Sequence, residues 1–326
     1  MIALSKKYPA YLNRFQSLIA LLVLCVCISI LSDKFLTLDN GWNILRQIAV
    51  NICISVGMTL VVLTAGIDLS VGSVLAFCGA ITAGLLKNGI PVESADLFIG
   101  FTLPGALLAG ILVGALLGFF NGFVITKFKV PPFVATLAML TIARGLTMLY
   151  TQGHPISNLG ASFSVIGTGW LLGIPVPVWI AGVVVLLAVF CTKQTRLGRY
   201  IYAIGGNENA AVLSGININK VKIIVYSIAG AMAAIGGIMV TSRLDSAQPN
   251  AGSGYELDAI AAVVIGGTSL SGGRGSIWGT VMGAVIIGVL NNGLVLLNVS
   301  PFWQQVVKGG VILIAVVIDR IGNKNE

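Results

Sequence analysis

The chain has 326 residues, of which 56% are hydrophobic and only 9% are charged. A soluble domain carries roughly 25% charged residues, so this composition excludes a water-soluble domain and a disordered chain and indicates a membrane protein of many helices. The formal net charge is +8, and because the basic residues flank apolar runs and do not cluster with aromatic side chains, they indicate membrane orientation and not nucleic-acid binding.

Ten segments are predicted as membrane spans, each of which needs about 20 mostly apolar residues. In chain order they are 15–31, 44–64, 69–86, 97–126, 133–149, 172–191, 223–241, 259–270, 277–297 and 302–318. The eighth, 259–270, is too short to cross alone, so we expect a broken or partly re-entrant span there. The alternation typical of barrel strands is missing, and the predicted fold is an all-α integral membrane protein.

The loop charges predict the orientation of these spans. An even number of spans leaves both termini on one side, which we assign to the cytoplasm. Thirteen basic residues then face the cytoplasm: Lys6, Lys7, Arg14, Lys127, Lys129, Lys193, Arg196, Arg199, Lys220, Lys222, Arg274, Arg320 and Lys324. Only Lys34, Lys87 and Arg243 lie in outer loops, while Arg46, Arg144 and Lys308 lie within spans. This imbalance is typical of the excess of positive charge in cytoplasmic loops.

The sequence contains an internal repeat. Residues 66–70 (GIDLS) open the third span and residues 254–258 (GYELD) open the eighth. Where span four meets span five, an Asn-Gly pair that begins at Asn121 is followed by a Pro-Phe pair. The same two pairs recur where span nine meets span ten, beginning at Asn292. Spans two to five therefore match spans seven to ten, and the odd number of spans between the copies makes the two units inverted. Inverted repeats are typical of transporters.

The acids at the repeated joints have two interpretations. Asp68, Ser70, Glu256 and Asp258 stand where helices are expected to start, where side-chain oxygens cap free backbone N–H groups and suit the positive end of a helix. Ionisable residues near the membrane are also costly and often functional, so a role in substrate contact or gating is the alternative.

A glycine ridge marks the fourth span. Its members stand every fourth residue, at Gly110, Gly114, Gly118 and Gly122, and such a flat face lets two helices approach closely. Packing against another span of the same chain is the first interpretation, and a contact between subunits is the second.

The sequence lacks the residues that several kinds of chemistry require. No G-x-x-x-x-G-K-[ST] loop is present to hold ATP phosphates, and no span carries paired carboxylates of the kind that proton pumps need. The five cysteines lie in apolar segments and His154 is the only histidine, so no metal site is expected. The nearly uncharged spans suit a neutral cargo such as a polyol or sugar. Asn51, Asn121, Asn291 and Asn292 are candidate pathway residues, with hydrogen bonding between helices as the alternative.

The longest inner loop, residues 192–221, is predicted to contain a short helix. Asn207 is a favourable N-cap and Glu208 suits the first turn, while Gly215 stands where a left-handed residue ends a helix. Thirty residues with such regular capping exceed the needs of a plain connector. We therefore expect the small face of this helix to dock in a groove of a soluble partner.

The sequence resembles the permease subunits of ABC sugar importers. The resemblance covers residues from about 15 to about 320. The matching stretches are 57–61, 64–73, 195–207, 213–217, 246–249, 254–262 and 266–270. It implies one transmembrane permease domain over 1–326, with a first half (15–191), a cytoplasmic coupling loop (192–221) and a second half (222–320). It also implies a multi-pass protein of the bacterial inner membrane, with ten helices in inverted halves.

This resemblance further implies the function and the partners. The chain is expected to form a homodimer in lipid, to receive a neutral sugar, ribose first, from a periplasmic binding protein, and to use a cytoplasmic ATPase that binds ATP and Mg²⁺. No cofactor is expected on this chain, and no nucleic acid. A permease for another pentose or hexose, and a secondary transporter working alone, are the alternatives. The coupling residues implied by the resemblance are Arg196, Gly198, Arg199, Tyr200, Ala203, Gly205, Asn207, Glu208, Ala210, Ala211 and Gly215, and the candidate pathway residues are Asn51, Asp68, Ser70, Asn121, Asn291 and Asn292.

Overall fold

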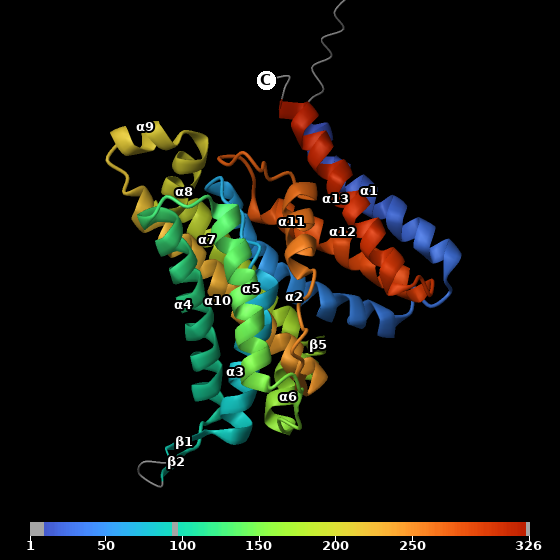
Figure 1. Ribbon diagram of the computed structural model, residues 1–326. Helices are drawn as coiled ribbons and strands as arrows, with labels where there is room; N and C mark the ends of the chain where they lie inside the picture. The colour runs from blue at the N-terminus through green and yellow to red at the C-terminus, as the bar shows by residue number, and fades with distance from the viewer. Residues whose placement is uncertain (1–9, 93–96, 324–326) are drawn as a thin grey trace, which may run out of the picture.

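The computed structural model describes residues 10–92 and 97–323 as a bundle of helices with short strands in its loops (Figure 1). The helices are α1 (Ala10–Leu31), α2 (Leu38–Leu63), α3 (Val71–Asn88), α4 (Leu103–Lys127), α5 (Pro132–Thr151), α6 (Ala161–Thr168), α7 (Val176–Gln194), α8 (Arg196–Gly206), α9 (Glu208–Leu213), α10 (Ile218–Leu244), α11 (Tyr255–Ile265), α12 (Ile277–Leu296) and α13 (Pro301–Asn323). The strands are β1 (Ile90–Val92), β2 (Leu97–Ile99), β3 (Ile156–Ser157), β4 (Trp170–Leu171), β5 (Ile174–Pro175) and β6 (Ser246–Ala247).

The strands pair only in twos. β1 pairs with β2 and β4 pairs with β5, each as an antiparallel hairpin. β3 pairs with β6, also antiparallel, and so ties the loop after α5 to the loop after α10. All other regular structure in the described residues is helical, and the structure confirms an all-α membrane protein.

Seven of the described helices are long and apolar enough to cross a membrane, namely α2, α3, α4, α5, α7, α10 and α12. The apolar stretches of α1 and α13, Leu18–Leu31 and Pro301–Val317, are shorter. Helix α11, in the place of the eighth predicted span, has 11 residues. Ten complete spans therefore stay a prediction.

The fourth predicted span, 97–126, begins later than its hydropathy indicates. Residues Leu97–Ile99 form β2 and pair with β1, and α4 starts at Leu103 after an extended Thr102 (φ −71°, ψ 158°). Pro104 lies in the first turn of α4, where a proline ring fits because the missing N–H has no helical partner. An apolar run alone does not distinguish a strand from a helix, which is why sequence reasoning merged the two.

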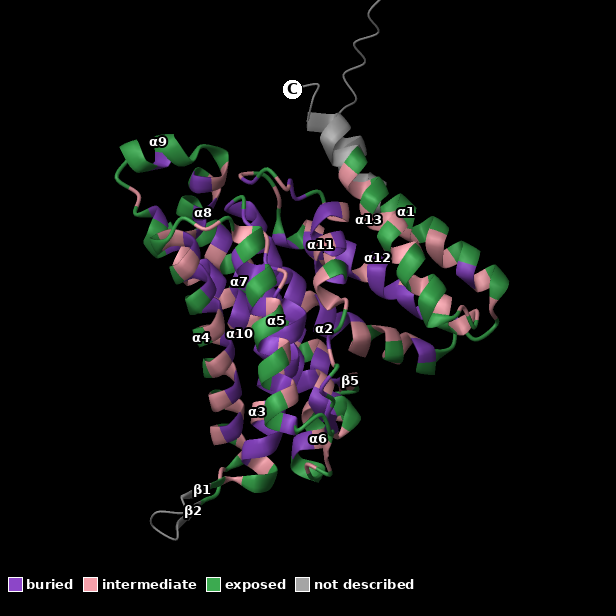
Figure 2. Cartoon of the chain, viewed as in Figure 1, coloured by how far each residue is buried: buried purple, intermediate pink, exposed green. Residues whose placement is uncertain are grey.

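Helix α10 occupies the centre of the bundle, packed against α2, α3 and α4. The glycine ridge of α4 faces it: a Cβ on Gly114 would meet Gly230, and a Cβ on Gly118 would meet the backbone of Tyr226. A Cβ on Gly110 would meet Thr82 of α3. The ridge therefore serves packing within the chain, and Figure 2 shows that buried residues gather along these central helices.

Helices α1, α12 and α13 lie to one side of this centre, on the right in Figure 1. Helix α2 runs from that side into the centre, and Asn40 near its start exchanges two amide hydrogen bonds with Asn292 of α12, of 3.0 and 2.8 Å. Both side chains are buried. Asn292 thus has the interhelical role that was the alternative to a place in the pathway.

Candidate functional site

The coupling-loop segment folds as two helices, α8 and α9, and not as one. Helix α8 is capped by Thr195, whose Oγ1 accepts a hydrogen bond from the Gly198 N–H at 3.2 Å. Ile201 and Ile204 point into the bundle and are almost fully buried. Sequence reasoning missed α8 because Gly198 and the Gly-Gly pair at its end lower helix propensity, although the Thr195 cap and the spacing of the two isoleucines were a usable signal.

Helix α9 carries both caps that the sequence predicts. Asn207 Oδ1 accepts a hydrogen bond from the Ala210 N–H at 3.0 Å. Gly215 has φ 79°, and its N–H donates to the Val212 carbonyl while the Ile216 N–H donates to the Ala211 carbonyl. This pair of hydrogen bonds is a Schellman motif, which requires the left-handed conformation that glycine adopts without strain.

Most of the predicted coupling residues lie on an open surface at this end of the bundle. The exposed ones are Arg196, Arg199, Tyr200, Ala203, Asn207, Glu208, Ala210 and Gly215, whereas Gly198 and Ala211 are buried and Gly205 is half-buried. Val212 and Leu213 of α9 are 56% and 88% exposed, and sequence reasoning did not single them out. Glu208 forms an ion pair of 2.8 Å with Lys222 of α10, which fixes α9 to the central helix.

The end of α8 is packed against two other segments. A Cβ on Gly205 would overlap the Leu63 carbonyl oxygen at the end of α2 and the backbone nitrogen of Gly273 in the loop before α12. Gly273 itself donates its N–H to the Leu63 carbonyl at 3.0 Å, and the Tyr202 hydroxyl donates to the Gly275 carbonyl at 2.9 Å. Helix α8 therefore connects the exposed surface directly to the end of α2.

The link between α2 and α3 holds a buried polar network. Asp68 Oδ1 accepts hydrogen bonds from the Ser70 N–H (2.9 Å) and the Ser70 hydroxyl (2.6 Å). Asn121 of α4 donates its Nδ2 to the same hydroxyl at 3.0 Å. Burial raises the pKa of Asp68, and the two hydrogen bonds from Ser70 oppose that rise. The capping interpretation of Ser70 is wrong, because its side chain accepts no hydrogen bond from the first turn of α3.

Replacing Asp68 with alanine is expected to destabilise the protein by about 1–3 kcal/mol, because buried donors on Ser70 lose their acceptor. Asparagine keeps an Oδ1 at the same place, so Asp68→Asn is the matched control and should retain most of the stability. The measurement is the thermal unfolding midpoint of each purified variant in detergent. Equal midpoints for the alanine variant and the wild type would show that the network contributes nothing.

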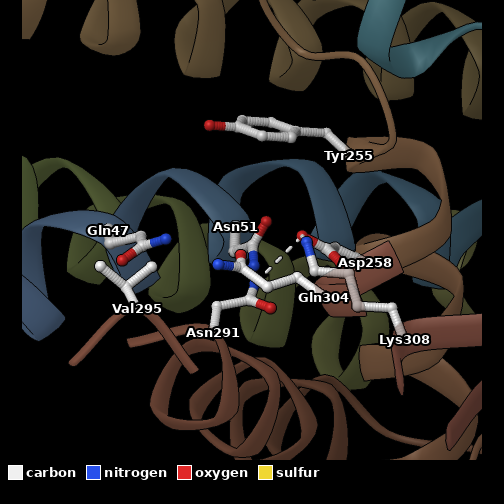
Figure 3. A pocket seen from close by; sticks show the side chains of 8 residues that line it. All are labelled: Gln47, Asn51, Tyr255, Asp258, Asn291, Val295, Gln304 and Lys308. Atoms are coloured by element: carbon white, nitrogen blue, oxygen red, sulfur yellow. Dashed lines mark hydrogen bonds and ion pairs between the residues drawn. The ribbon is translucent and has the colours of Figure 1, made fainter. Parts of the chain in front are cut away.

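A second polar cluster lies between α2, α11, α12 and α13 and surrounds a cavity of about 80 Å³ (Figure 3). Each helix contributes two lining residues. They are Gln47 and Asn51 on α2, Tyr255 and Asp258 on α11, Asn291 and Val295 on α12, and Gln304 and Lys308 on α13. Seven of these eight side chains carry polar atoms, which is costly inside a membrane unless the groups find partners.

The cluster is organised around Asp258, whose side chain is only 4% exposed. Lys308 reaches from α13 to place its Nζ 3.0 Å from Asp258 Oδ2, and Asn291 donates its Nδ2 to the same oxygen at 3.2 Å (Figure 3). Gln304 donates to the Val299 carbonyl at 2.8 Å. Asn291 Oδ1 is buried and has no hydrogen-bond partner, so the cavity wall contains an acceptor that nothing in the described chain satisfies.

The six predicted pathway residues thus fall in three places. Asn51 and Asn291 meet at the cavity, Asp68, Ser70 and Asn121 form the separate network, and Asn292 pairs with Asn40. Gln47, Tyr255 and Gln304 also line the cavity and were missed by sequence reasoning, whereas Lys308 was expected to snorkel or pair within the chain and not to line a pathway. A signal for them existed, since the two residues from each helix stand three or four positions apart and so share one helix face.

Comparisons with known proteins place the chain among transport subunits. The family model described as "Branched-chain amino acid transport system / permease component" matches residues 41–316. The chain is 53% identical to the ribose import permease protein of Escherichia coli (strain K12), with 95% of each chain covered. It is 50% identical to that of Bacillus subtilis (strain 168), covering 96% of this chain and 94% of the relative. The D-allose transport system permease protein of E. coli (strain K12) is 40% identical over 91% and 88%. No solved structure matches.

Proposed function

The chain belongs to the family of branched-chain amino acid transport system permease components, and we propose that it is the membrane subunit of an ABC importer for ribose. The observation that carries this proposal is the likeness to ribose import permeases over nearly the whole chain, in both Escherichia coli and Bacillus subtilis. Permeases named for allose and xylose match at lower identity. The protein is a multi-pass inner-membrane transport component and not an enzyme.

The energy and the sugar come from other chains in this proposal. A cytoplasmic ATPase binds ATP and Mg²⁺, a periplasmic binding protein delivers ribose, and two copies of the permease form the passage in lipid. The small number of charged residues in the spans supports this division, because the sequence lacks the paired span carboxylates of a proton pump and the phosphate-binding loop of a nucleotide site.

Ten spans in two inverted halves, with both termini in the cytoplasm, complete the proposed topology. Two similar hydrogen bonds support the repeat: Asn121 of α4 donates to Ser70 before α3, and Asn291 of α12, the neighbour of the repeated Asn292, donates to Asp258 of α11. Each bond joins the third helix of a proposed half to a residue near the start of the second. The end of α13 lies on the same side of the molecule as α8 and α9 (Figure 1), in keeping with a shared cytoplasmic side.

The surface of α8 and α9 is the proposed docking site of the ATPase, with residues 192–221 as the coupling loop of a single permease domain. Two features support it. The exposed apolar side chains of Val212 and Leu213 need a partner to leave water, and α8 contacts the end of α2, which leads into the transport domain.

Uptake into liposomes tests the proposed function. The permease, its ATPase and its binding protein are reconstituted together, and we expect ribose uptake that requires ATP and the binding protein. The control is the permease alone with a proton gradient. Uptake driven by that gradient without the ATPase would establish a secondary transporter instead.

Replacing Leu213 with aspartate is expected to reduce binding of the ATPase at least tenfold, because a charge would replace an apolar contact at the centre of the proposed docking site. The measurement is the amount of ATPase that copurifies with the membrane-inserted permease. Leu213→Met keeps the side chain apolar, and Asn219→Asp adds the same charge to exposed α10 nearby; both should bind normally. Equal binding by the Leu213→Asp variant would remove α9 from the interface.

A further inference from the structure

We infer that the cavity between α2, α11, α12 and α13 is a sugar-contact site of the transport path, where amide side chains exchange hydrogen bonds with the hydroxyl groups of the cargo. The inference rests on the proposed function and assigns a place and a set of residues to its cargo. It starts from the composition of the wall: four amide side chains, one tyrosine and one ion pair line one small space.

The chemistry of the wall selects a neutral polyhydroxyl ligand. Asn and Gln side chains both donate and accept hydrogen bonds, as sugar hydroxyls do. Asp258 and Lys308 neutralise each other at 3.0 Å, so the wall offers no unpaired charge to an ionic ligand and would not repay its desolvation. The Tyr255 ring lies on the opposite side of the cavity from Asn291 in Figure 3, where it can cover the apolar face of a sugar ring.

The unpartnered Asn291 Oδ1 distinguishes this cluster from ordinary helix packing. Asn291 is 5% exposed, and its Nδ2 is fixed by Asp258, so its oxygen cannot turn away to find a partner without breaking that bond. The neighbouring Asn292 shows the contrasting case, because Asn40 satisfies both ends of its amide. A buried acceptor without a partner costs free energy unless a bound group supplies a donor, and a sugar hydroxyl supplies one.

The volume of the cavity limits how much of a sugar molecule it can enclose. A space of about 80 Å³ holds several water molecules, since each needs roughly 10–15 Å³ by this measure. The site therefore holds one edge of a sugar in this conformation and not the whole ring enclosed. Gln304 and Lys308, which line the site, belong to α13 at the side of the bundle (Figure 1).

The double variant Asn291→Ala/Gln304→Ala tests the inference in the liposome system with the ATPase and the loaded binding protein. The readout is the number of ribose molecules imported per ATP hydrolysed. We expect this ratio to fall at least about fivefold, the effect of losing one of the two amides' hydrogen bonds to a neutral partner, while the ATPase rate stimulated by the binding protein stays at the wild-type value. A purely structural cluster would instead lower both rates together.

Two further variants keep the result interpretable. Asn292→Ala removes an amide of the same type outside the cavity and should lower thermal stability without changing the ratio. Gln47→Ala alters a half-buried lining residue and should also lower the ratio. It supplies the test if the double variant fails to insert in the membrane. An unchanged ratio in every cavity variant would overturn the inference, whereas absent ATP-driven ribose uptake by the wild type would overturn the proposed function itself.

Discussion

Replacing Gly205 with alanine is expected to lower ATP-driven ribose uptake about tenfold while the protein still inserts in the membrane. The added Cβ would overlap the Leu63 carbonyl oxygen and the backbone nitrogen of Gly273. Neither atom can move by a change of rotamer, because both belong to the backbone and are joined by the Gly273–Leu63 hydrogen bond. Overpacking of this kind costs about 1–3 kcal/mol, and 1.4 kcal/mol lowers the population of the docked α8 tenfold.

The adjacent glycine provides a matched control. A Cβ on Gly206 would meet nothing within 4 Å, so Gly206→Ala makes the same chemical change one residue away and should transport normally. Uptake, the ATPase rate and the amount of bound ATPase are measured for both variants. If Gly205→Ala binds the ATPase and hydrolyses ATP but imports little ribose, the contact between α8 and α2 transmits the coupling. Normal uptake by Gly205→Ala would exclude that role.

Replacing Lys308 with methionine is expected to cause the largest loss of stability among single changes near the cavity. It leaves the Asp258 carboxylate, 4% exposed, without its cationic partner. Removing one member of a buried ion pair costs about 3–5 kcal/mol, and we expect the lower end of this range because the Lys308 side chain is itself 25% exposed. The measurement is the thermal unfolding midpoint of the purified variant in detergent.

The double variant Asp258→Asn/Lys308→Met separates charge burial from packing. Asparagine removes the unpaired charge and keeps an oxygen for the amide of Asn291, which donates to Asp258 at 3.2 Å. The double variant should therefore be more stable than Lys308→Met alone. A double variant that is less stable than both single variants would show that these side chains act mainly through shape.

The positions of most helices could be predicted from the apolar runs of the sequence, and the exceptions have physical reasons. The predicted span 97–126 combined strand β2 with helix α4, because a short apolar strand and a buried helix have the same hydropathy. Pro104 was the available sign of where the helix begins. Helix α8 was missed because its glycines are poor helix formers. At Gly205 the backbone of α2 and of the loop before α12 approach too closely for a side chain, a contact that no local pattern indicates.

The candidate site was only partly predictable for a similar reason. Polar residues in apolar segments are conspicuous, so Asn51 and Asn291 were among the candidate pathway residues, and both line the same cavity. Their grouping depends on which helix faces meet, and the same criterion selected Asn292, which belongs to a separate amide pair with Asn40. Gln304 was overlooked because it lies near the start of α13, where a polar residue is easily attributed to the membrane boundary. Lys308 was expected to snorkel or to pair within the chain, and it pairs with Asp258.

The glycine ridge of α4 has a consequence for biosynthesis. Its partner α10 is translated only after α5, α6, α7, α8 and α9, so Gly114 and Gly118 enter the bilayer before Gly230 and Tyr226 exist. During that interval the ridge exposes backbone to lipid with few side-chain contacts of its own, and α3 covers only part of it, at Gly110 and one side of Gly114. The bundle must therefore be completed late, when α10 slides against helices that are already inserted. Chain interruptions between α5 and α10 should leave a membrane-bound fragment that the cell's quality-control proteases recognise.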